Sequence, residues 1–152
     1  MIAGAFSLSF RITYSDTDQM GFMHHSNYLS YYETARWELF REIGIPYSGL
    51  ENDGFILPVV NVMVKYLKPA LYDQEIRVET SISSLRGASI IFENAAYNKE
   101  GEKINEAKIT VACVKKSTGK ACHPPDSLAR KLSDLITVMK KDGDSKNRNN
   151  NL

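Results

Sequence analysis

The sequence has little excess charge, few cysteines and no long apolar run, and each of these absences excludes a class of protein. Its 152 residues include 19 lysines and arginines against 18 aspartates and glutamates, so the formal net charge is +1. Without a basic surplus there is no electrostatic bias toward nucleic acid. Polar residues interrupt the N-terminal apolar stretch before it is long enough for export or membrane insertion. We therefore expect a cytoplasmic protein that neither binds nucleic acid nor inserts into a membrane.

The two cysteines, Cys113 and Cys122, are too few for a disulfide framework or a zinc site. Cys113 falls within an alternating apolar run, where a buried thiol is expected. This cysteine usage favours a reducing compartment.

The spacing of apolar residues predicts strands and one long helix. From Phe6 to Tyr14 they alternate with polar residues, which is typical of a half-buried strand. Spacings of three and four predict a helix from Asn27 to Ile43, capped by Ser26 or Asn27. After a loop at 46–54, alternation predicts strands at 60–66, 76–82, 90–97 and 107–113, the first two of them half-buried. A change of phase at Glu93–Asn94 indicates either a bulge or a strand covered on both faces.

A second, shorter amphipathic helix is predicted from Pro125. The order of strand, helix, four strands and helix argues against a parallel doubly wound sheet. It favours an α+β architecture in which an antiparallel sheet packs on one helix. The length suits one domain with its own core, for which we expect residues 1–140, followed by a disordered polar tail at 141–152.

The side chains best suited to chemistry lie between the first strand and the long helix: Asp16, Asp18, His24 and His25. The aspartates imitate the start of a calcium loop, but Met20 and Asn27 stand where further ligands are needed. Adjacent histidines point apart in most backbone conformations, which disfavours zinc. No serine lies in a G-x-S-x-G motif, and Cys122 and His123 are merely sequence neighbours. We expect no metal and no serine or thiol hydrolase.

An aspartate just before a helix start has a definite chemical use. The first turn of a helix offers free N–H groups and a partial positive charge, which can polarise a carbonyl and hold an oxyanion. A carboxylate is a weak nucleophile and base, so it suits a thioester, whose thiol leaves easily because its pKa is about 8.5. The alternative is that both aspartates are ordinary turn or capping residues and that the histidines lie in solvent.

The segment from Tyr14 to Arg36 resembles the signature of hotdog-fold acyl-CoA thioesterases of the 4-hydroxybenzoyl-CoA and YbgC type. The shared residues are Tyr14, Asp16, Thr17, Asp18, Gly21, His25, Asn27, Tyr28, Tyr31, Glu33, Ala35 and Arg36. The predicted elements from residue 5 to 116 also follow the order of that family. The resemblance implies a hotdog fold, a five-stranded antiparallel sheet wrapped around the long helix, to which this chain adds a C-terminal helix.

The resemblance also implies roles for individual residues. Asp18 would be the nucleophile or the general base, and the N–H of His25 would polarise the thioester carbonyl, with its side chain also involved. The substrate-positioning residues would be Gly21, Asn27 and Tyr28. Arg86 and Ser89 would contact CoA, although their segment is equally typical of an ordinary polar hairpin turn.

Three neighbouring residues are expected to play supporting parts. Asp16 is expected to structure the loop and His24 to lie in solvent. Glu33 is expected to form an ion pair with Arg36.

The sequence thus predicts an acyl-CoA thioesterase that needs no cofactor. The substrate could equally be carried by an acyl carrier protein, and the family implies a homodimer or homotetramer with sites at the interface. The alternatives are a non-catalytic acyl-binding or scaffold module and, less favoured, a hotdog hydratase or dehydratase. The last class resembles a different Asp/His motif and usually carries an Asn-Pro element, which is missing here.

Overall fold

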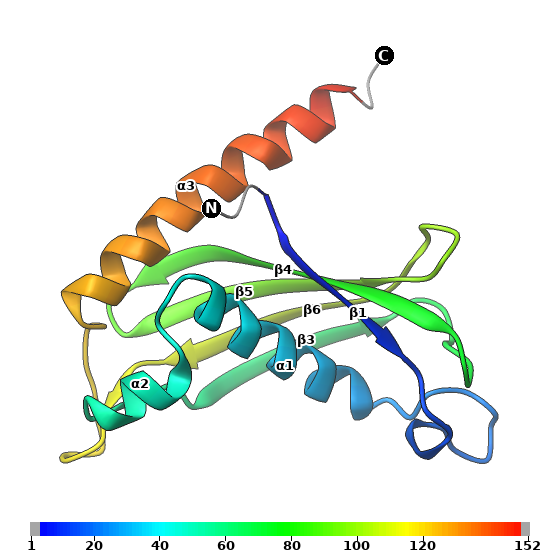
Figure 1. Cartoon of the computed structure of the whole chain (residues 1–152), viewed down its shortest axis with the longest axis horizontal. Coiled ribbons are helices and arrows are strands. Elements are labelled where there is room, and N and C mark those ends of the chain that lie inside the picture. Colours follow the sequence, from blue (N-terminus) through cyan, green and yellow to red (C-terminus); the bar gives the residue numbers. More distant parts are fainter. Residues whose placement is uncertain (1–3, 150–152) are drawn as a thin grey trace.

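A five-stranded antiparallel sheet is the largest element of the computed structural model, which describes residues 4–149 (Figure 1). Its spatial order is β1 (Phe6–Arg11), β4 (Glu75–Arg86), β5 (Ser89–Tyr97), β6 (Lys103–Ala112) and β3 (Val59–Tyr66). Every neighbouring pair is antiparallel. The predicted α+β architecture with an antiparallel sheet is confirmed. The first strand ends earlier than expected, because the chain turns into the short 3-10 helix η1 (Tyr14–Asp16).

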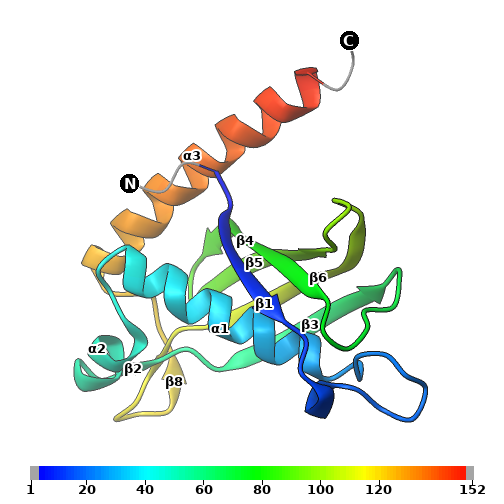
Figure 2. The same ribbon diagram turned by 45° about the vertical axis from the view of Figure 1, so that its right-hand side comes forward.

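The predicted long helix is confirmed as α1 (Asn27–Glu42), which lies against one face of the sheet (Figures 1 and 2). Its inward stripe consists of Tyr28, Tyr32, Ala35, Arg36, Leu39 and Phe40. Gly44 follows the helix at a φ of +78° and donates its N–H to the carbonyl of Arg41. The expected caps are wrong, since Ser26 makes no capping hydrogen bond and the Asn27 amide binds elsewhere.

The face of the sheet toward α1 is built from alternate residues of β4, β5 and β6. In β5, Asn94 continues the buried series and donates from Nδ2 to the hydroxyl of Thr80 at 2.7 Å. Glu93 is exposed on the other face, and both residues pair regularly with both neighbouring strands. The predicted change of phase is therefore wrong. The polar Asn94 interrupts the apolar pattern but not the alternation. The register shifts of this strand lie elsewhere, opposite Ile82–Ser84 of β4 and between Ala96 and Tyr97 against β6.

Strand β3 forms one edge of the sheet and is exposed along most of its length. Val60 is 57% exposed and Met63 is 62% exposed. The prediction that this strand is half-buried is wrong, because no described element covers its outer edge. An edge that is both apolar and unpaired is a ready surface for another strand.

The segment expected to be a loop at 46–54 contains a short helix, α2 (Tyr47–Asn52). A small second sheet follows, made of β2 (Phe55–Ile56), β7 (Val114–Lys115) and β8 (Lys120–Ala121), and it lies beside α2 (Figure 2).

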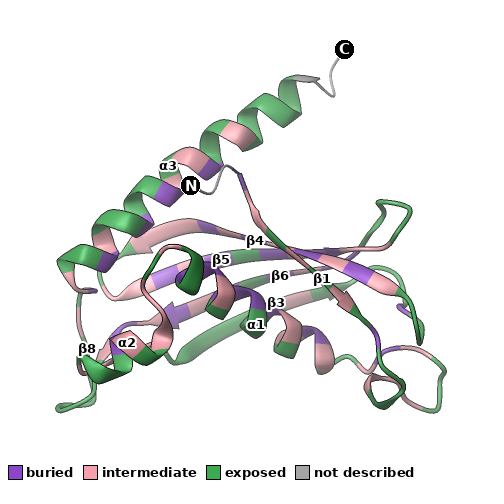
Figure 3. Cartoon of the chain, in the orientation of Figure 1, coloured by how far each residue is buried: buried purple, intermediate pink, exposed green. Residues whose placement is uncertain are grey.

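The C-terminal helix, α3 (Asp126–Asn149), packs along β4. It lies beside the part of β4 that follows Thr80, the last residue of that strand to pair with β1. Its buried residues are Leu128, Leu132, Leu135 and Met139, and the part that follows projects away and is mostly exposed (Figure 3). A disordered tail is expected from residue 141, but the structure continues α3 to Asn149. Residues 150–152 lie outside the described part. Extending an anchored helix costs no new nucleation, so polar residues can continue it. Within 4–149, no helix is long and apolar enough to span a membrane.

Candidate functional site

The loop between η1 and α1 is a tight hairpin. Thr17 and Met23 form an isolated antiparallel bridge, and Asp18 donates its N–H to the carbonyl of Phe22 at 3.2 Å. Gly21 donates its N–H to the carbonyl of Asp18 at 3.0 Å and adopts a φ of +85°, which a side chain would strain. Gly21 thus serves the shape of the loop, which leads into the start of α1 (Figure 2).

Asp16 fastens this loop to the helix. Its Oδ2 accepts hydrogen bonds from the Thr13 N–H and hydroxyl, both at 2.9 Å, and from the Tyr31 hydroxyl at 2.5 Å. Its carbonyl accepts from the N–H of His24 and from Nδ2 of Asn27, each at 2.8 Å. Asp16 therefore structures the loop, as expected from the sequence, and Asn27 acts as a tie between loop and helix.

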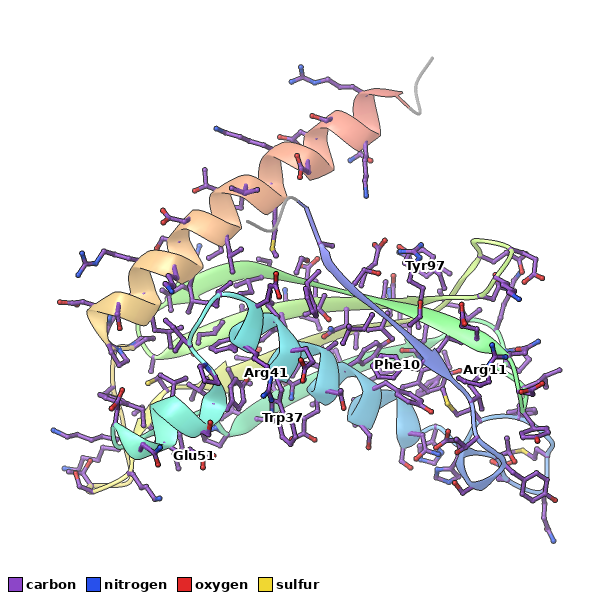
Figure 4. All side chains as sticks on the ribbon, viewed as in Figure 1. Phe10, Arg11, Trp37, Arg41, Glu51 and Tyr97 are labelled. Atoms are coloured by element: carbon purple, nitrogen blue, oxygen red, sulfur yellow. The ribbon has the colours of Figure 1, made fainter. Side chains whose placement is uncertain are left out.

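The electrostatics of this anchor follow from its contacts. Burial opposes ionisation of Asp16, but the hydrogen bonds from Tyr31 and Thr13 outweigh it and lower the pKa of the carboxyl group. Burial, followed by the Asp16 carboxylate, raises the pKa of Tyr31. Tyr31 is in turn held by Phe10, which Figure 4 labels on β1, and their ring centroids are 4.6 Å apart. The anchor thus joins the loop, the helix and the first strand.

Asp18 is held less completely. It is half-buried, and its Oδ1 accepts the N–H of Met20 at 2.8 Å. Its Oδ2 has no hydrogen-bond partner among residues 4–149. Each aspartate keeps one carboxylate oxygen without a hydrogen-bond partner among residues 4–149, but the Asp16 carboxylate accepts three hydrogen bonds and the Asp18 carboxylate accepts one.

His25 lies two residues before Asn27, the first residue of α1, and is exposed. Within the described part of the chain, no acceptor takes its backbone N–H. From the sequence, the two histidine rings are expected to point apart. In the structure they lie side by side, with centroids 4.1 Å apart. His24 is nevertheless bound locally, with Nδ1 2.8 Å from the hydroxyl of Ser26. No cluster of three or more His, Cys, Asp or Glu side chains suited to a metal occurs in 4–149.

One residue beside this cluster, Tyr66 at the end of β3, was not predicted as a site residue. Its hydroxyl donates to the carbonyl of His25 at 3.1 Å. Its ring also meets the buried ring of Tyr28 edge-on, with centroids 5.6 Å apart. Burial, followed by the proximity of Tyr66, raises the pKa of Tyr28 to about 12. No local sequence signal marks Tyr66, because its role depends on the packing of β3 beside the helix start.

The expected ion pair between Glu33 and Arg36 is absent from the described residues. Glu33 is exposed, whereas Arg36 is only 4% exposed and lies over the ring of Phe92, 5.7 Å from its centroid. Position 36 falls on the inward stripe of α1, so the guanidinium turns toward the sheet.

Arg86 and Ser89 do not lie near Asp18 within one chain. They face each other at the hairpin that joins β4 to β5, while Glu75 at the start of β4 pairs with Arg11 at the end of β1. The 12 residues of β4 span about 36 Å at roughly 3.3 Å per residue. The predicted residues of 18–28 thus lie in one loop and in the start of the helix that follows it, and these two lie at the opposite end of the sheet.

A hollow of about 660 Å³ lies on the outer face of the sheet, away from this cluster. Met63, Glu93 and Lys108 are among the residues that line it, and no residue of 14–28 does. The hollow is therefore not part of the candidate site.

Comparison with known proteins gives concordant matches. The family model described as "Thioesterase-like superfamily" matches residues 12–132. The acyl-CoA thioester hydrolase YbgC of Escherichia coli O6:H1 is 35% identical over 104 residues, which cover 68% of this chain and 78% of that protein. The putative acyl-CoA thioesterase YneP of Bacillus subtilis is 35% identical over 130 residues, 86% of this chain and 91% of that protein. A crystal structure of a hypothetical protein from Aquifex aeolicus matches with a TM-score of 0.79 and 29% identity, covering 84% of this chain and 98% of that chain.

Proposed function

We propose, because this chain belongs to the thioesterase-like superfamily, that it hydrolyses the thioester of an acyl-CoA to a free acid and a thiol. The names of its relatives in Escherichia coli and Bacillus subtilis support this activity. One observation carries the assignment to a site. Asp18, with a carboxylate oxygen that no described residue binds, lies in the hairpin that leads to the free N–H of His25.

The mechanism follows from these two groups. The N–H of His25 and the positive end of α1 would polarise the thioester carbonyl and stabilise the oxyanion. Asp18 would then attack the carbonyl carbon directly or take a proton from an attacking water. In the direct route, loss of the thiolate leaves the acyl group on Asp18 as an anhydride, which water would hydrolyse to release the free acid and restore the carboxylate. Collapse of the oxyanion would expel the thiolate, which needs no strong general acid because its pKa is about 8.5. Asp16 is less suited to either role, because three hydrogen bonds from Thr13 and Tyr31 hold its Oδ2 and lower the pKa of the carboxyl group, which makes it a weaker base.

The other predicted residues would position the groups that react. Gly21 would hold the hairpin tip, Asn27 would tie the loop to α1, and Tyr28 would support the first helical turn from below. The mechanism uses only backbone and side-chain groups, so it needs neither metal nor cofactor. We also infer that the sheet wraps around α1 as in a hotdog fold, which agrees with the burial of Tyr32 and Leu39.

Binding of CoA by Arg86 and Ser89 would require a second copy of the chain. Within one chain these residues lie at the far end of the sheet, so only another copy could bring such a hairpin to the helix start. The unpaired apolar edge of β3 offers a surface for that copy, which supports a homodimer or homotetramer. An acyl group on an acyl carrier protein presents the same thioester and is the alternative substrate. A cytoplasmic location stays a prediction from composition.

The test is hydrolysis of an acyl-CoA panel, followed with a thiol-reactive dye, beside one acyl carrier protein substrate. We expect Asp18→Asn to lower kcat by about a thousandfold, because the variant keeps the shape but loses the base or nucleophile. Asp53→Asn is the matched control, since Asp53 is exposed and makes no side-chain hydrogen bond within 4–149. Unchanged turnover in folded Asp18→Asn would exclude the mechanism. Ligand binding without thiol release would favour a binding module, and loss of enoyl-CoA absorbance would indicate a hydratase.

A further inference from the structure

We propose that Tyr66 is a positioning residue that holds the peptide at the start of α1 in the geometry required for polarising the thioester carbonyl. This inference rests on the proposed hydrolysis and adds a residue from outside the segment 14–36. Tyr66 comes from β3, so the candidate site would be built from the helix start and from the edge strand of the sheet.

Three contacts place Tyr66 against the residues on which the mechanism depends. Its hydroxyl donates to the His25 carbonyl at 3.1 Å, across 41 residues of sequence. Its ring lies edge-on to the His25 ring, with centroids 6.3 Å apart, and edge-on to Tyr28, with centroids 5.6 Å apart. One side chain therefore touches the backbone and the ring of His25 as well as the first turn of the helix.

The position that Tyr66 holds needs such support. His25 precedes the helical part of the chain, so the repeating hydrogen bonds of α1 do not fix its backbone as they fix the residues that follow. An N–H that stabilises an oxyanion acts well only when it is already oriented before the charge develops. A hydrogen bond on the carbonyl of the same residue restricts rotation of the chain at this point.

The exposure of Tyr66 connects this role to assembly. Tyr66 is 50% exposed, because β3 lies at the edge of the sheet. In a single chain, water can compete for its hydroxyl. A second copy paired on β3 would exclude that water and strengthen the bond to His25, since hydrogen bonds are stronger in a less polar surrounding.

The decisive variant is Tyr66→Phe, which keeps the ring and removes only the hydroxyl. We expect kcat to fall about fivefold to tenfold, the loss that corresponds to one ordinary hydrogen bond, while KM stays within about twofold. Tyr72→Phe is the control, because Tyr72 is 57% exposed, contacts Tyr14 and makes no hydrogen bond from its hydroxyl within 4–149. A kcat equal to that of wild type, or a matching loss in the control, overturns the proposal.

A second measurement does not depend on turnover. In NMR spectra, Tyr66→Phe should shift the carbonyl carbon of His25 and the amide of Ser26, and Tyr72→Phe should leave both in place. Unchanged His25 and Ser26 signals in Tyr66→Phe overturn the proposal even if kcat falls. If the wild type releases no thiol from any substrate, the proposed function is refuted, and a catalytic role for Tyr66 is refuted with it. The NMR comparison then still decides whether Tyr66 holds His25.

Discussion

Replacing Asp16 by alanine should destabilise the protein through the loop anchor. The variant removes the acceptor of the Thr13 N–H and hydroxyl and leaves the half-buried hydroxyl of Tyr31 without its partner. Loss of the capping interaction costs about 1 kcal/mol. Loss of the hydrogen bond to Tyr31 costs about a further 1 kcal/mol, less than is usual for a charged acceptor because the site is partly exposed. The expected decrease in unfolding free energy is about 2 kcal/mol.

Thermal and urea unfolding, followed by circular dichroism, measure this decrease. For a chain of this length it corresponds to a fall in Tm of about 4–8 °C. Asp53→Ala removes an exposed aspartate without side-chain partners and should change the stability by less than about 0.5 kcal/mol. A loss in Asp16→Ala no larger than in this control would refute the assignment of Asp16 as an anchor.

The pH dependence gives an independent check on the same reasoning. The pKa of Asp16 in the folded protein is lowered from its ordinary value of 3.8. A lowered folded pKa means that ionised Asp16 stabilises the fold above the unfolded value, and that this contribution is lost as the pH falls through the folded value. The stability difference between wild type and Asp16→Ala should therefore be full at about pH 7 and shrink toward about pH 3. A difference that grows in acid would contradict the sign.

Two further predictions concern the sheet edge and the cysteines. Val60→Lys places a charge on the exposed edge of β3 and should reduce the molecular mass measured by light scattering, and an unchanged mass would exclude β3 as the interface. Burial, followed by the hydrogen bond with Cys122, raises the pKa of Cys113 to about 12. Maleimide should therefore label Cys122 first in mass spectrometry of digested protein, and equal rates at both thiols would contradict the buried position of Cys113.

Elements whose signal is local could be predicted from the sequence. The alternation at 76–82 reflects one buried face of β4, and the spacing in 27–43 reflects the inward stripe of α1. The residues of 14–28 are close in the chain, so any compact path keeps them close in space. The structural role expected for Asp16 also depends on near neighbours in the chain, and its hydrogen bonds with Thr13 and Tyr31 give the physical cause.

Features that depend on strand order could not be predicted in this way. The valines of β3 alternate like the buried residues of β4, and only the order of strands makes β3 an edge. In the sequence, Asn94 looks like a change of phase, because its partner Thr80 comes from another strand. Helical spacing alone pairs Arg36 with Glu33, whereas in the structure the ring of Phe92 lies beneath the Arg36 guanidinium.

The same dependence on strand order bears on where the reaction would occur. The helix start that carries His25 meets the end of β3 at Tyr66, so the proposed site begins at the edge that a second copy would cover. The hairpin of Arg86 and Ser89 cannot reach that point within its own chain. If β3 pairs with another copy, one event would bury the hydroxyl of Tyr66, bring a second surface beside Asp18 and allow a CoA site to form between chains. A variant that blocks this pairing should then lose activity without losing its fold, which links the light-scattering experiment to the turnover measurements.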